Sequence, residues 1–183
     1  LADTAKAVAA YNGSNTAPTA AQIQAIAGGA LIATPENLAT VQAAIATANN
    51  DGTAITQAEL QAIIAGLDTT APTAPSGITV TATGGTVVAD TLNASNTALD
   101  FAATVTAGEA TGGRAEFYIG NTLVGTDSSI GANDTSVSYH AAGSNTTAAE
   151  LQALIAAGGQ VSVKLYDAAG NSVSANGPTL VRD

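Results

Sequence analysis

The spacing of hydrophobic residues changes part-way along the chain. In the first third, large apolar residues recur at helical spacing, as Val41 and Ile45 do. In the remainder, apolar and polar residues alternate, as they do from Val161 to Leu165, and this two-residue period is typical of strands. The pattern therefore predicts a helical part followed by a strand-rich part.

Start signals predict four short helices in residues 1–67. Thr19 and Thr56 are each followed, three residues later, by Gln or Glu, which is the capping-box pattern. Thr34 precedes a proline, a combination that suits a helix cap and the first helical position. With an opening helix that reaches Tyr11, these signals predict a small alanine-rich four-helix domain.

Residues 78–183 are expected to form about seven short strands. A third capping box, at Thr147, predicts one helix between the fifth and sixth strands. Short alternating strands separated by turns are typical of an immunoglobulin-like sandwich. The expected strands are residues 78–83, 99–105, 115–119, 122–126, 137–139, 161–166 and 172–181.

A segment rich in threonine and proline joins the two parts. Pro72 and Pro75 exclude a helix there and favour an extended chain. We therefore predict a two-domain α + β protein, with a four-helix Ala-rich domain over 1–67, a stiff linker and entry segment over 68–77, and a β-sandwich with one inserted helix over 78–183.

Three stretches of the second part carry a family resemblance. They are DTTAPTAPSGITV from Asp68, RAEFYIGNTLVGTD from Arg114 and VKLYDAAGNSVS from Val163. Over roughly residues 68–183 the chain resembles the bacterial immunoglobulin-like repeats of giant secreted surface proteins and biofilm adhesins. The resemblance implies an extracellular, non-catalytic chain of tandem modules that often hold Ca²⁺ at their junctions. The inserted helix departs from the usual pattern of that family.

Net charge argues against several classes of partner. Four Lys and Arg residues stand against fourteen Asp and Glu residues, which gives a net charge of −10. Nucleic acids and anionic membranes need cationic partners, so neither is expected to bind. The sequence has no Cys and no apolar run near the roughly 20 residues of a membrane helix, so we expect neither disulfides nor membrane insertion.

Four oxygen-bearing side chains are expected to converge beside the linker. In a sandwich, the turn from Asp167 to Asn171 lies at the end where the chain enters, and the loop with Glu109 lies at the same end. Together with Asp68, these residues would supply carboxylate and amide oxygens, which Ca²⁺ binds in sets of six to eight. We predict a calcium site from these four residues; the alternative is that Asp167 and Asn171 only satisfy their own turn.

Two further candidate sites are weaker. The loop from Asn49 to Glu59 has the composition of a calcium helix-loop-helix but the wrong register: with Gly52 as its sixth residue, the bidentate acid should fall on Ala58. We interpret it as a turn followed by a capping box. His140 is the only histidine, so we expect neither a paired-histidine zinc site nor a catalytic triad, and interpret it as a surface residue.

Three classes of function follow. The first is a spacer or adhesive module of a long bacterial cell-surface protein, stiffened by Ca²⁺, with neighbouring modules and a cell-surface or glycan ligand as partners. Asp183 matches Asp68 as an entry residue, so we expect a further module in tandem. The alternative is a self-assembling subunit of a surface layer (S-layer) or extracellular filament, with identical subunits as partners. A sugar-binding accessory domain is a third class.

Overall fold

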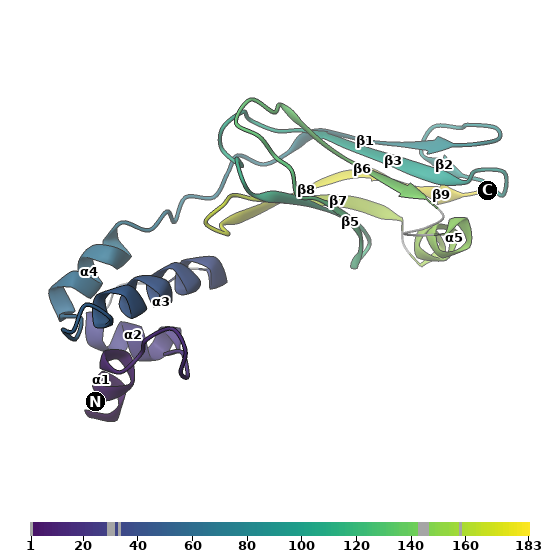
Figure 1. Cartoon of the computed structure of the whole chain (residues 1–183). Coiled ribbons are helices and arrows are strands. Elements are labelled where there is room, and N and C mark those ends of the chain that lie inside the picture. Colours follow the sequence, from purple (N-terminus) through teal and green to yellow (C-terminus); the bar gives the residue numbers. More distant parts are fainter. Residues whose placement is uncertain (1, 29–31, 33, 143–146, 158) are drawn as a thin grey trace. The chain divides into compact units, whose positions relative to one another are not determined.

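The computed structural model describes residues 2–28, 32, 34–142, 147–157 and 159–183 (Figure 1). It has mixed α + β structure with antiparallel sheets, which confirms the predicted α + β class. The chain divides into two compact units, described separately below. The helical unit comprises residues 1–70 with 169–171, and the strand unit comprises residues 71–168 with 172–183.

Four helices form the helical unit, as the start signals predict. They are α1 (Ala2–Ala9), α2 (Ala20–Ala27), α3 (Pro35–Asn49) and α4 (Gln57–Ala65). The capping boxes of Thr19 and Thr56 are both present, and Thr34 caps α3 with a proline at the first helical position. Each cap satisfies backbone N–H groups that a helix start leaves without partners, so these helices begin where the local sequence dictates.

One apolar cluster holds the helical unit together. The side chain of Asn49 lies at one end of this cluster. Its Nδ2 donates to the carbonyl oxygens of Val8 and Tyr11, both at 2.8 Å. Its Oδ1 accepts the N–H of Ile55 at 2.9 Å. This one amide therefore joins the end of α1 to the loop that precedes α4. The buried members are Val8, Tyr11, Ile23, Ala27, Ile32, Val41, Ile45, Leu60 and Ile64.

Two antiparallel sheets dominate the strand unit. The first has the order β1-β3-β6, with β1 at Ser76–Thr83, β3 at Ala98–Thr104 and β6 at Ser136–Ala142. The second has the order β5-β4-β7-β8, with β4 at Arg114–Ile119, β5 at Thr122–Asp127, β7 at Gln160–Tyr166 and β8 at Ser172–Thr179. All seven predicted strands are confirmed.

Three further elements complete the strand unit. Helix α5 (Ala148–Ala156) lies between β6 and β7 and starts with the capping box of Thr147, as predicted. The short strands β2 (Thr91–Leu92) and β9 (Val181–Arg182) pair in parallel. The sequence analysis did not predict this pair, and it assigned Val181 to the last long strand.

Both sheets contribute to one core. Phe101 of β3 and Phe117 of β4 lie with their ring centroids 5.8 Å apart, and the ring of Tyr139 from β6 stacks 6.3 Å from Phe117. Gly125 of β5 makes room for that ring, because a Cβ atom at this position would overlap the Tyr139 ring. The aromatic rings therefore fix how the two sheets face each other.

The chain enters and leaves the two sheets at opposite ends (Figure 1). At the entry, the backbone N–H of Thr73 donates to Glu109, in the loop between β3 and β4. At the exit, the N–H of Leu180 donates to the carbonyl of Gly159 at 2.8 Å, beside α5. The entry and the exit of the strand unit therefore lie at opposite ends of its strands.

Candidate functional site

The four predicted calcium ligands are divided between the two units. Asp68 and Asn171 belong to the helical unit, where the side-chain amide of Asn171 donates to the backbone oxygen of Asp68 at 3.0 Å. Glu109 and Asp167 belong to the strand unit. Among the described residues, no group of three or more His, Cys, Asp and Glu side chains is placed to hold a metal ion.

Within the strand unit, Glu109 and Asp167 have different surroundings. The Glu109 carboxylate accepts the N–H of Thr73 at 2.6 Å, and this hydrogen bond lowers the pKa of Glu109. Asp167 is buried, with 6% of its surface exposed. Ca²⁺ also binds amide and backbone oxygens, so calcium binding stays a prediction for measurement in solution.

The second calcium candidate is a turn and a cap, as the sequence analysis interprets it. The Asp51 carboxylate accepts from the backbone N–H and the hydroxyl of Thr53, at 2.9 and 2.7 Å. Glu59 instead accepts from the N–H and hydroxyl of Thr56, at 2.8 and 2.7 Å. The two carboxylates therefore serve separate local structures.

His140 lies on the surface, as expected. Its side chain is 61% exposed, and its Nδ1 atom contacts the carboxylate of Asp100 on the adjacent strand β3. The two residues are direct cross-strand neighbours, so this contact follows from the register of β3 and β6.

The outer face of the four-stranded sheet concentrates polar and aromatic side chains. Alternate residues of β4 and β7 are half-buried there, while the residues between them are buried in the core. We call this set the tyrosine face; it comprises Arg114, Glu116 and Tyr118 of β4 with Ser162, Lys164 and Tyr166 of β7. Register places Arg114 opposite Tyr166, Glu116 opposite Lys164 and Tyr118 opposite Ser162.

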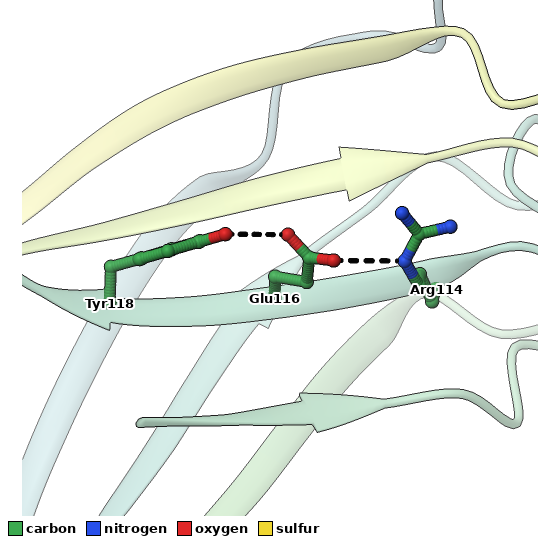
Figure 2. A network of polar contacts seen from close by, with 3 residues as sticks. All are labelled: Arg114, Glu116 and Tyr118. Carbon is green, nitrogen blue, oxygen red and sulfur yellow. Dashed lines mark hydrogen bonds and ion pairs between the residues drawn. The ribbon is translucent and has the colours of Figure 1, made fainter. Parts of the chain in front are cut away.

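Glu116 is the centre of a hydrogen-bonded row along β4 (Figure 2). Its Oε1 accepts from Nε of Arg114 at 2.9 Å, and its Oε2 accepts from the hydroxyl of Tyr118 at 2.6 Å. Charge-assisted bonds of this kind are shorter and stronger than neutral ones. The row therefore holds three side chains in fixed orientations on a rigid strand.

Two cations lie against one ring on the tyrosine face. The guanidinium carbon of Arg114 lies 3.7 Å from the ring centroid of Tyr166, and Nζ of Lys164 lies 4.8 Å from it. Both distances are within the range of cation–π attraction. Since the chain has only four Lys and Arg residues, this face holds half of its formal positive charge.

Hydrogen bonds in the row shift the pKa values of Glu116 and Tyr118 further from neutral pH. Partial burial would raise the pKa of Glu116, but hydrogen bonds from Tyr118, Arg114 and Tyr166 outweigh it and the pKa is lowered. The bond to Glu116 is the main cause that raises the pKa of Tyr118 to about 12. Neither group is therefore expected to change its protonation state near neutral pH.

The sequence analysis did not select these residues. Their alternation along β4 and β7 was visible, and it predicted strands over residues 115–119 and 161–166. What it lacked was the register that places β4 beside β7, because strand pairing joins residues about 50 positions apart.

Comparison of the chain with protein-family models, with curated proteins and with solved structures gives no match. No helix in the described part of the chain is both long enough and apolar enough to cross a membrane.

Proposed function

We propose that this chain is a non-catalytic module of an extracellular bacterial surface protein, in which an immunoglobulin-like strand unit acts as a spacer and adhesive element. The order of the seven long strands supports the fold. The first, second and fifth form one sheet, and the fourth, third, sixth and seventh form the other. This order supports the proposed immunoglobulin-like sandwich, in a form whose fourth strand pairs with its third.

The observation that carries the spacer function is the position of the two chain ends of the strand unit. The chain enters at one end of the sheets and leaves at the opposite end (Figure 1). A pull on the chain is therefore transmitted along the strands, and many inter-strand hydrogen bonds resist it together. The helical unit has only helices around a small core, which can unravel turn by turn.

Single-molecule force measurement on the full chain, held between marker domains, tests this function. We expect two unfolding events, with the strand unit unfolding at the higher force. Phe117→Ala should lower that force selectively, because it removes a fully buried ring worth about 3–5 kcal/mol in comparable cores. A strand unit that unfolds at or below the force of the helical unit would contradict a spacer role.

Calcium stiffening is a separate part of the proposal. If Asp68, Glu109, Asp167 and Asn171 bind Ca²⁺, saturation at about 100 times the dissociation constant should stabilise the folded state by about 2.7 kcal/mol. The measurement is a thermal melt in millimolar Ca²⁺ against chelator, repeated with Asp167→Ala. An unchanged melting temperature in the original chain would exclude calcium but would leave the spacer function intact.

Self-assembly is the alternative function, and one observation favours it. Strand β1 is at the edge of its sheet and pairs only with β3 among the named strands. Beside it is a groove of about 530 Å³, where Val87 and Val88 are 52% and 47% exposed. Unprotected edges are known sites of strand addition. A second copy bound there would give ordered sheets or fibres in electron micrographs, and Val88→Lys should prevent them.

A further inference from the structure

The tyrosine face has a depression at one end, next to the turn between β4 and β5. Its volume is about 250 Å³, and its lining residues are Tyr118, Gly120, Asn121, Ser162, Lys164 and Ser174. That volume is below the roughly 300–1,000 Å³ of sites for drug-sized ligands, so it suits one ring-sized group. Most of the depression is on the sheet; Gly120 and Asn121 belong to the tight turn after β4.

Lys164 gives the depression its charge. Among the residues described, its ammonium group has no ion-pair partner, and it lies against the Tyr166 ring. Glu116 lies directly opposite Lys164 in the register, but its two oxygens accept from Arg114 and Tyr118. Glu116 thus bonds within its own strand, and it forms no ion pair with Lys164 among the described residues, so the ammonium of Lys164 is available to an anion.

Neutral donors and a ring surround this charge. Asn121, Ser162 and Ser174, whose side chains carry an amide and two hydroxyls, line the same depression. The Tyr118 side chain extends along β4 toward Glu116, which holds its hydroxyl (Figure 2). A group that fits all of these has one carboxylate for the ammonium, several hydroxyls for the amide and serines, and an apolar ring face for the tyrosine.

We propose that the Lys164 depression binds a uronic acid residue, the carboxylated sugar unit of an acidic polysaccharide. The carboxylate would pair with Lys164 and the sugar ring would lie against Tyr118. This inference rests on the proposed adhesive function, for which it names the ligand class. The net charge of −10 opposes a polyanion at long range, but the screening length is about 8 Å at physiological ionic strength. Short segments of the polysaccharide therefore reach the depression without much repulsion.

Titration of the full chain with trigalacturonate, followed by amide NMR shifts, tests this proposal. We expect weak binding, with the largest shifts at Asn121, Ser162 and Lys164. The uncharged galactose trisaccharide should bind at least about tenfold more weakly, because it lacks the charge-assisted contact. An absence of shifts with trigalacturonate, or equal affinity for the neutral sugar, would overturn the proposal.

Matched variants separate the contributions of charge and ring. Lys164→Gln should weaken trigalacturonate binding about tenfold or more, whereas Lys6→Gln, the same charge change in the helical unit, should not alter it. Tyr118→Ala should also weaken binding, because it removes the ring. Equal losses from Lys6→Gln and Lys164→Gln would show that only net charge matters, and would overturn the proposed site.

An acidic peptide is the competing ligand. If a tetra-aspartate peptide binds as tightly as trigalacturonate and Tyr118→Ala changes neither, the depression recognises a carboxylate alone and the sugar assignment is wrong. The force measurement distinguishes this failure from failure of the proposed function, because the unfolding force of the strand unit does not depend on an occupied depression.

Discussion

Helices α4 and α5 have nearly the same sequence but belong to different cores. Their sequences are QAELQAIIA and AAELQALIA, which differ only at the first and seventh positions. Helix α4 packs against α2 and α3 in the helical unit, and α5 lies beside β9 in the strand unit. The same stretch of sequence therefore supports a helical bundle in one unit and covers the end of a sheet in the other.

The two helices use equivalent residues in equivalent ways. Leu60 and Ile64 are the buried residues of α4, and Leu151 and Ile155 are those of α5. The glutamine after each leucine donates to a backbone carbonyl of a neighbouring segment: Gln61 to Ala27 at 2.6 Å, and Gln152 to Asn93 at 3.3 Å. Local sequence thus decides where such a helix starts and which face is buried, while the rest of the unit decides what that face contacts.

Truncation of the buried leucines should have the largest effect on the stability of the two units. Leu60→Ala and Leu151→Ala each leave a cavity in a core and should each cost about 2–5 kcal/mol of unfolding free energy. We expect Leu60→Ala to unfold only the helical unit and Leu151→Ala to destabilise only the strand unit. Hydrogen exchange monitored by NMR would resolve the two. Equal loss of protection in both units for either variant would show that they unfold as one.

Separate expression is the control for that result. We expect residues 68–183 to fold alone with a strand signal in circular dichroism, and residues 1–67 to be only marginally stable, because so short a chain buries little area. If residues 68–183 stay unfolded, the predicted domain boundary is wrong.

Removal of the helix caps should have a smaller effect. Thr56→Ala and Thr147→Ala each remove a hydroxyl that accepts a backbone N–H at the helix start, at a cost of about 1 kcal/mol. Because the two capping boxes have the same geometry, we expect similar losses in both units, read as shifts in the denaturant midpoint. Thr→Ser at each position should retain most of the stability. If serine is as harmful as alanine, the methyl group matters and the cap does not.

Acidification should have the smallest effect on stability. It should act through Glu59 and Glu150, the glutamates of the two capping boxes. Hydrogen bonds from Thr56 and Thr147 lower the pKa of Glu59 and Glu150 below the usual 4.5. A lowered folded-state pKa means that each ionised glutamate stabilises its helix above pH 4.5, and that this contribution is lost as the pH falls through the lowered value.

Glutamine at these positions tests whether loss of the glutamate charge destabilises the helices in acid. Gln22 already completes the capping box of α2, so Glu59→Gln and Glu150→Gln should keep the cap and remove its titration. The difference in melting temperature between pH 7 and pH 3 should therefore be smaller in each variant than in the original chain. An unchanged difference would mean that other carboxylates cause the acid sensitivity.

Local signals made the helices and long strands predictable. A threonine cap with its partner three residues later lies within one turn of chain, and alternation from Arg114 to Ile119 lies within one strand. The parallel pair of β2 and β9 was missed because two-residue strands have no period. The candidate site was missed for a related reason: the position of Lys164 opposite Glu116 depends on pairing between distant strands, which alternation alone does not specify.

The bond between Tyr118 and Glu116 also has a spectroscopic consequence. The chain has no Trp and four Tyr residues, of which Tyr11 alone is in the helical unit. Ultraviolet absorbance and near-ultraviolet dichroism therefore report mainly on the strand unit. In an alkaline titration, the tyrosinate absorbance of Tyr118 should appear late, near its pKa of about 12, and Glu116→Gln should bring it forward. Absorbance alone can thus report whether the hydrogen-bonded row along β4 is intact.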